Sequence, residues 1–156
     1  MKKLFVLLAA ALFFTGCAST QTETEKLANC KYALRSVEIS DYNVNSLSFD
    51  IVIAITNLNR KDTAKLKRFE GELSMNDTPV SKINLEEATI LPNATHNAKT
   101  HITVPMSAFS SKLLGLVSMN SGTIDYHLTG TMYFEGPLGA EIPIPVDIGR
   151  IGGYNT

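Results

Sequence analysis

The stretch Ser46 to Asn57, SLSFDIVIAITN, decides the fold, because large apolar side chains occupy every second position along it. One parity is wholly apolar and consists of Leu47, Phe49, Ile51, Ile53 and Ile55. The other parity holds smaller or polar side chains, namely Ser48, Asp50, Val52, Ala54 and Thr56. A period of two is typical of a β-strand that buries one face. The stretch therefore predicts a long strand with its apolar face in a core.

The same period recurs on both sides of this strand. It is found in Phe69, Gly71, Leu73 and Met75, in Ile102 and Val104, in residues 124–134, and in Ile142, Ile144, Val146 and Ile148. Before the central strand, the apolar parity changes between Leu34 and Val37. An extra residue in one strand of a pair makes such a change, so we expect a β-bulge near Arg35 and Ser36.

Two prolines place the last strand. Pro143 and Pro145 are two residues apart, so they remove N–H donors from the same lateral side of that strand. We therefore expect it at the edge of a sheet. Turn signals at Asn76-Asp77, Pro92-Asn93 and Gly136-Pro137 separate the strands. About seven short strands with such turns between them predict an all-β, antiparallel β-sandwich.

One segment, residues 107–120, breaks the period of two. Its apolar residues are spaced as one helical face, and they are Phe109, Leu113, Leu116 and Val117. Ser107 is the expected N-cap, and Asn120 is an expected end of the helix. We expect one short helix here, packed over an open end of the sheets.

The first residues of the chain have the three parts of a secretory signal peptide. Lys2 and Lys3 form a basic head, and an unbroken apolar run from Leu4 to Phe14 follows it. Phe14-Thr15-Gly16-Cys17 resembles the lipobox of bacterial lipoprotein precursors. This resemblance implies that Cys17 carries lipid and becomes the new N-terminus after cleavage. The alternative is an ordinary cleavable signal followed by a chance cysteine.

These features divide the chain into four parts: a signal peptide at 1–16, a lipidated cysteine and flexible tether at 17–29, a folded domain at 30–151, and a flexible tail at 152–156. The tether has an expected reach of about 20 Å. In the diderm lipoproteins that the lipobox resembles, Asp after the lipidated cysteine favours retention in the inner membrane. This chain has Ala18 there, so the resemblance implies the outer membrane of a bacterial cell envelope, with the domain facing the periplasm.

Composition and titratable residues give no sign of catalysis. Without Lys2 and Lys3 the chain keeps 12 basic residues against 15 acidic ones, a net charge near -3, so nucleic acid is not an expected partner. If Cys17 carries lipid, Cys30 has no partner in the chain, and we expect it to be buried. We expect no catalytic residues, no cofactor and no metal site, and we interpret His96, His101 and His127 as solvated surface residues.

The order of features over residues 31–151 resembles the late-embryogenesis-abundant type 2 proteins with a water stress and hypersensitive response (WHy) domain. The features are Asn57-Leu58-Asn59 after the long strand, Leu91-Pro92-Asn93, the helix, residues 124–130, and Ile142-Pro143 with Gly149. The resemblance implies a seven-stranded sandwich of fibronectin III or immunoglobulin-like shape and a role in stress or desiccation tolerance. It implies no catalytic residues. Both asparagines of Asn57-Leu58-Asn59 can cap the turn with their side chains.

One segment concentrates positive charge. Residues 60–68 contain five basic residues and one acid, and the basic ones are Arg60, Lys61, Lys65, Lys67 and Arg68. They follow the Asn57–Asn59 turn, so we place them in a loop and at the start of the next strand. They could contact anionic lipid headgroups or an acidic partner. The alternative is a solvated loop.

The sequence thus favours a membrane-anchored, non-enzymatic envelope lipoprotein with a protective role under water stress. The alternative is a binding module, which carries lipid or another apolar ligand or serves as an accessory subunit of an envelope complex. A sizeable apolar pocket between the sheets would favour the binding module, and a fully packed core would disfavour it. The oligomeric state is left open.

Overall fold

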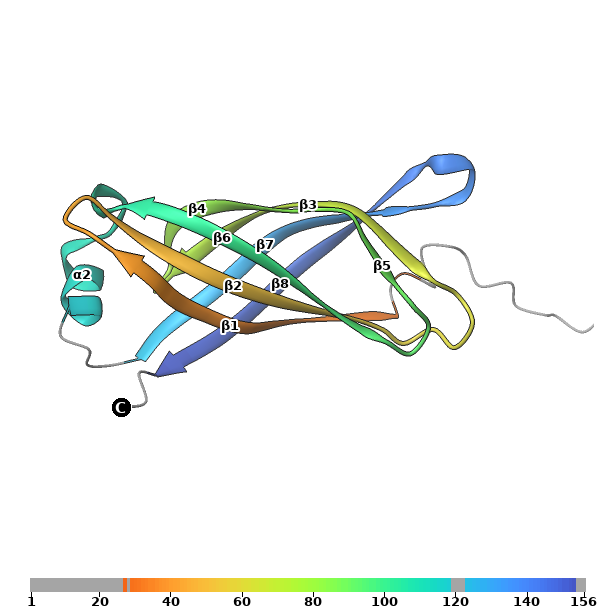
Figure 1. The fold of residues 1–156 in the computed structure, drawn as a ribbon, viewed down its shortest axis with the longest axis horizontal. Helices are drawn as coiled ribbons and strands as arrows, with labels where there is room; N and C mark the ends of the chain where they lie inside the picture. The colour runs from red at the N-terminus through yellow and green to blue at the C-terminus, as the bar shows by residue number, and fades with distance from the viewer. Residues whose placement is uncertain (1–26, 28, 119–122, 154–156) are drawn as a thin grey trace, which may run out of the picture.

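The computed structural model describes residues 27, 29–118 and 123–153 and forms two antiparallel sheets. The first sheet has the strand order β1-β2-β6, and the second has the order β4-β3-β7-β8 with β5 also paired to β3. Figure 1 shows the two sheets lying along one long axis with α2 at one end. The signal peptide, the lipobox and most of the expected tether lie outside the described residues.

The three-stranded sheet is built around Ser46–Asn57, the stretch that was predicted to be a long strand. It consists of β1 (Cys30–Tyr42), β2 (Ser46–Asn57) and β6 (Thr95–Pro105). The apolar parity of β2 is buried as expected, with Ile51, Ile53 and Ile55 fully inaccessible to solvent. The pairing register of β1 with β2 shifts between Leu34 and Ser36, which confirms the predicted bulge.

The second sheet has five strands: β3 (Ala64–Met75), β4 (Thr78–Leu85), β5 (Ala88–Ile90), β7 (Thr123–Glu135) and β8 (Glu141–Gly153). β8 pairs with β7 alone, so Pro143 and Pro145 lie in an edge strand as predicted. The described chain thus contains eight strands rather than the seven expected. The difference arises because β4 and β5 pair in succession along the same edge of β3 and are separated at Glu86 and Glu87.

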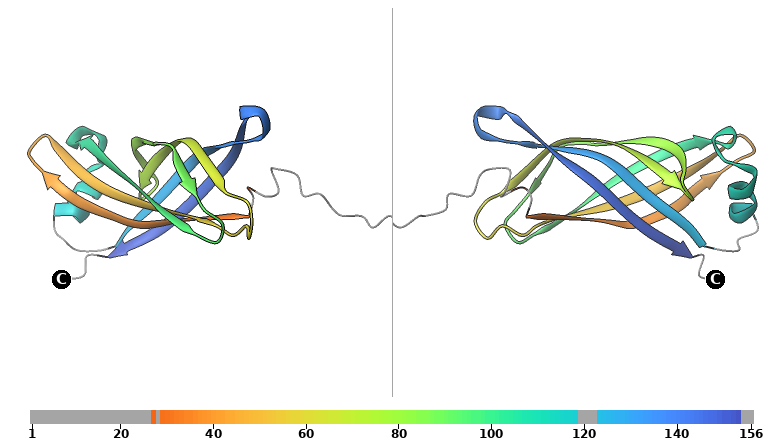
Figure 2. Two further views of the ribbon diagram at one scale, coloured as in Figure 1. Left: turned by 45° about the vertical axis from the view of Figure 1, so that its right-hand side comes forward. Right: turned by 180° about the vertical axis from the view of Figure 1, so that it is seen from behind.

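The two sheets enclose one core. Buried apolar residues of both sheets form a single cluster, and Phe49, Phe69 and Phe134 are its largest fully buried side chains. The sheets also approach each other at their edges, where β1 contacts β8 and β6 contacts β4 and β5. In the left view of Figure 2, β7 and β8 cross behind β1 and β2, and in the right view, seen from behind, they lie in front.

The helical segment differs from its prediction at its start. A 3-10 turn, η1 (Met106–Ala108), comes first, and α2 (Ser111–Ser118) begins only after extended backbone at Phe109. Ser110, not Ser107, is the cap, since its Oγ accepts the N–H of Leu113 at 3.2 Å. Leu113 is buried, so this part of the apolar face packs on the core as expected.

The side chains of Leu116 and Val117, and the predicted helix end at Asn120, lie outside what the structure describes. Within the described residues, no helix has the length and apolar character needed to cross a membrane.

Both ends of the folded part extend slightly past the boundaries expected from the sequence. Leu27, within the expected tether, is buried and belongs to the core cluster. At the other end, β8 reaches Gly153, two residues into the expected tail. The predicted turns are also present, and Asn76, Asp77 and Asn93 adopt the left-handed backbone conformation that asparagine and aspartate tolerate.

Candidate functional site

One end of the domain carries two of the five basic residues that the sequence marked as functional, Arg60 and Lys61. We call it the entry end, and it consists of residues 27, 29 and 30, the loop 58–63, the turn 91–94 and the tip of the β7–β8 hairpin, 136–140. In Figure 1 these segments lie at the right, opposite α2. The 3-10 turn η2 (Pro137–Gly139) forms the hairpin tip. The pairing of Cys30 with Asn57 places the start of β1 beside the end of β2.

A buried asparagine holds the loops of the entry end together. The side chain of Asn57 is inaccessible to solvent. Its Nδ2 donates to the carbonyl oxygens of Asp62 at 2.8 Å and Ile90 at 3.1 Å. Its Oδ1 accepts the backbone N–H of Asn59 at 3.0 Å and the Nδ2 of the same residue at 2.8 Å. The Asn57 side chain therefore caps the turn as expected, whereas the bonds described for the Asn59 side chain are to the side chains of Asn57 and Asn29. These bonds use all the hydrogen-bonding groups of the Asn57 amide.

The same network joins the turn to the segment that enters the domain. The Nδ2 of Asn29 lies 3.4 Å from the Oδ1 of Asn59, and the N–H of Leu58 donates to the carbonyl of Asn29 at 3.2 Å. The N–H of Asn93 donates to the carbonyl of Asn59 at 3.0 Å. The three segments are therefore fixed to one another, while the side chain of Leu58 stays 45% exposed.

The basic residues of 60–68 fall into two groups. Lys65, Lys67 and Arg68 lie on β3, where acidic side chains neutralise them. Glu135 on β7 lies 3.3 Å from the Nζ of Lys65 and 3.2 Å from the Nζ of Lys67. Lys67 also lies 3.2 Å from Glu87. These pairs lower the pKa of Glu135, chiefly through its hydrogen bond with Lys67, and raise that of Lys67.

Arg68 is held by partners on three sides. Its Nη2 lies 2.9 Å from Glu141, its Nη1 pairs with Glu70, and its guanidinium stacks over the ring of Tyr133 at 3.7 Å. The hydrogen bond from Arg68 is the main cause that lowers the pKa of Glu141. A guanidinium fixed in this way fastens β3 to the outer side of β7 and β8 and has little freedom to bind another molecule.

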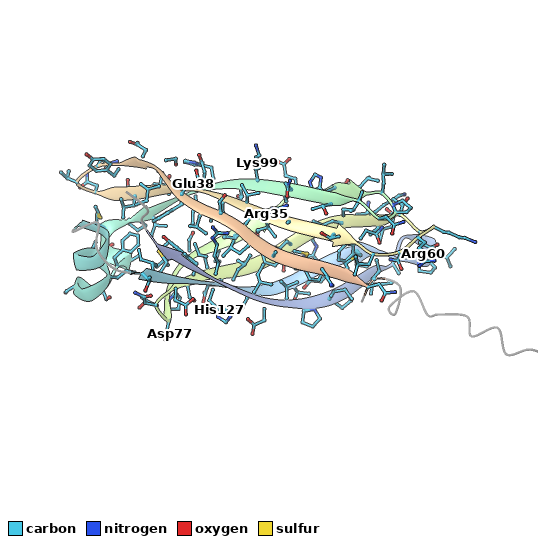
Figure 3. The ribbon with its side chains drawn as sticks, turned by 90° about the horizontal axis from the view of Figure 1, so that it is seen from below. Arg35, Glu38, Arg60, Asp77, Lys99 and His127 are labelled. Carbon is cyan, nitrogen blue, oxygen red and sulfur yellow. The ribbon has the colours of Figure 1, made fainter. Side chains whose placement is uncertain are left out.

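Arg60 and Lys61 form the second group. Both are exposed in the loop 58–63, and among the residues that the structure describes neither forms an ion pair. Figure 3 shows Arg60 reaching outward at the entry end, whereas Asp77 lies near the opposite end. The structure therefore separates two free cations at the loop from three that pair within the second sheet.

The sequence analysis missed a bulge in β3 next to the paired cations. The register of β3 with β7 shifts between Leu66 and Arg68, so Lys67 is the extra residue. Leu66 and Phe69 are both fully buried although they are three residues apart. Their spacing could have indicated the bulge. In a regular strand, residues three apart face opposite sides of the sheet, so both can face the core only if an extra residue lies between them.

The three histidines do not come together. His101 lies on β6 and His127 on β7, in different sheets. The Nδ1 of His101 is 2.7 Å from Asp50, and His127 pairs with Asp147. His96 is half-buried and opposite Ile55 in register. In the described part of the chain, no three His, Cys, Asp or Glu residues are grouped in a way that could hold a metal ion.

Cys30 behaves as a structural residue. Its thiol is buried at the start of β1, as the sequence predicted, and burial raises its pKa. The neighbouring Tyr32 hydroxyl also has a raised pKa because of burial. A buried thiol with a raised pKa is a poor nucleophile, so Cys30 serves the core as a small apolar side chain.

Comparison with known proteins gives a likeness in fold only. No family model matches the chain, and no curated protein matches it. Among solved structures, AT1g01470 from Arabidopsis thaliana matches with a TM-score of 0.61 at 16% identity, over 78% of this chain and 80% of that one. At2g46140.1, a protein proposed to be late embryogenesis abundant, matches with a TM-score of 0.52 at 17% identity, over 82% and 74%.

A structural-genomics target, SoR45, matches with a TM-score of 0.53 at 14% identity, over 80% of this chain and 86% of that one. Such low identities carry no residue roles from one protein to another. What the chain shares with these proteins, one of them of the late-embryogenesis-abundant type that the sequence resembles, is the fold.

Proposed function

We propose that this chain is a non-enzymatic envelope lipoprotein, anchored through lipid on Cys17, whose WHy-like domain protects envelope components under water stress. The outer membrane, with the domain in the periplasm, is the proposed location. The observation that carries the protective role is the likeness in fold to At2g46140.1. The observation that carries the anchor is the sequence Phe14-Thr15-Gly16-Cys17 after a signal-like apolar run.

The two surface hollows described below give no support to the transport of an apolar ligand. Side chains from both sheets form one buried cluster. Two hollows of the described surface lie over outer strand faces. One is lined by charged residues such as Glu38, Asp50 and Lys99, and the other by Glu70, Glu72 and Lys82. Sites for apolar ligands are lined mainly by apolar side chains, so neither hollow suits a lipid tail.

The test uses cells that lack the gene, complemented with the parent chain, Cys17→Ser or Cys30→Ala. We expect a fatty-acid analogue to label the parent and Cys30→Ala but not Cys17→Ser. Survival after drying and rehydration should rise with the two labelled chains. Label on Cys17→Ser would refute the anchor. Survival that is the same with and without the parent chain would refute the protective role, whatever the labelling shows.

A further inference from the structure

The entry end exposes large apolar side chains next to its free cations. Leu58 is 45% exposed and Leu91 is 60% exposed, and the two turns that carry them are joined by the hydrogen bond from Asn93 to Asn59. Leu138, at the tip of the β7–β8 hairpin, is fully exposed. Arg60 and Lys61 follow Leu58 directly.

Leucine side chains beside lysine or arginine are the combination that binds the interface of an anionic bilayer. The apolar groups enter the headgroup boundary, and the cations remain at the phosphates. We infer that the entry end is a second membrane contact, in which Leu58, Leu91 and Leu138 insert shallowly and Arg60 and Lys61 bind anionic headgroups. This inference rests on the proposed anchor, since the anchor decides which end faces the membrane.

The geometry of the chain supports this choice of end. Nine residues, 18–26, separate Cys17 from the buried Leu27, so the chain between them can span at most about 36 Å. β2 has 12 residues, so the α2 end lies about 40 Å beyond the entry end. An anchored domain therefore presents the entry end to the bilayer. Tyr42 and Val44, which are exposed in the β1–β2 hairpin, lie at the far end.

The charge distribution also indicates that the loop, rather than the rest of residues 60–68, provides the cations that bind the membrane. Attraction to a surface decays over about 8 Å at physiological salt, so only cations at the tip of the entry end contribute. Lys65 and Lys67 share Glu135 and Glu87, which cancels their charge locally. Arg60 and Lys61 share their loop with one acid, Asp62, so the loop keeps a net positive charge.

The chain contains no tryptophan, so one introduced tryptophan reports its own position. The experiment uses the complete mature chain, residues 17–156, with Cys17 coupled to a maleimide phospholipid in vesicles. Cys30→Ala serves as the background, so that coupling has one site. Leu58→Trp and Leu91→Trp report the entry end, and Val44→Trp reports the far end. Vesicles with and without phosphatidylglycerol carry brominated acyl chains that quench tryptophan on contact.

We expect quenching at positions 58 and 91 in vesicles with phosphatidylglycerol, and little quenching at 44. Arg60→Ser and Lys61→Ser should each weaken docking about fivefold. The matched control substitutions, Lys65→Ser and Lys67→Ser, should change the strength of docking little. High salt should also weaken docking, as Arg60→Ser and Lys61→Ser do.

Equal quenching at 44 and 58 would overturn the inference, and so would docking that depends on Lys65 and Lys67 but not on Arg60 and Lys61. Absence of quenching at both 58 and 91 would also overturn it and would leave an acidic protein as the partner to seek. Because coupling is chemical, these outcomes do not depend on natural lipidation, which the fatty-acid label tests separately.

Discussion

Asn57→Ala should be among the most damaging substitutions at the entry end, although it removes little volume. The Asn57 side chain makes four hydrogen bonds, two as donor and two as acceptor, and is fully buried. Alanine would leave the carbonyls of Asp62 and Ile90 and two N–H groups of Asn59 without these partners. An unpaired buried group costs about 1–3 kcal/mol, and water that enters the loop should satisfy some of them.

We therefore expect Asn57→Ala to lower the free energy of unfolding by about 3–5 kcal/mol. This is a large part of the 5–15 kcal/mol typical of a whole domain. Asn57→Asp should cost at least as much at neutral pH, because a carboxylate would face the two carbonyl oxygens that Nδ2 now binds. The assay is urea unfolding of the chain from Ala18, followed by circular dichroism.

The matched control is Thr56→Ala in the adjacent position. Thr56 is half-buried, and among the described residues its hydroxyl bonds to that of Thr95 alone, at 2.8 Å. We expect a cost of about 1 kcal/mol or less there. A loss below about 1 kcal/mol for Asn57→Ala, or one no larger than that of Thr56→Ala, would show that Asn57 does not hold the loops together.

Three further predictions concern the second sheet and the helix. A Cβ added at Gly130 would lie 2.4 Å from the backbone oxygen of Glu70, so Gly130→Ala should cost about 3 kcal/mol, measured by urea unfolding. At Gly115 in α2, none of the described residues comes within 4 Å of an added Cβ, so Gly115→Ala should instead stabilise by about 0.5 kcal/mol. The lowered pKa values of Glu135 and Glu141 stabilise the fold above pH 4.5, and this contribution should be lost as the pH falls further. Unfolding midpoints across acid pH test this, and a loss that high salt leaves unchanged would contradict the ion-pair origin.

Local periodicity accounts for what the sequence predicted well. The buried face of β2, the bulge after Leu34 and the edge position of Pro143 and Pro145 each follow from side chains within one strand. In each case the geometry of one or two residues decides the outcome. Cys30 was expected to be buried as a small apolar side chain at the start of an apolar segment, and it is buried.

Features that depend on other strands could not be predicted in this way. The N-cap is Ser110 rather than Ser107 because Pro105 is followed by a 3-10 turn before the helix begins. Either serine satisfies the local rule for a cap. The neutralisation of Lys67 depends on Glu135, which lies on β7 and reaches β3 only through their pairing. Net charge along the sequence therefore overstated the positive charge available at this segment.

The position of the loop 58–63 relative to the start of the folded domain follows from one hairpin. β1 and β2 pair antiparallel, so the start of β1 at Cys30 must lie beside the end of β2 at Asn57. Any chain that enters through β1 and leaves β2 into a loop brings its entry point and that loop to the same end. The bonds from Asn29 to Asn59 and from Leu58 to Asn29 then fix the two segments together. If lipid on Cys17 holds the chain at a bilayer, the pairing that builds the core also turns Leu58, Arg60 and Lys61 toward that bilayer.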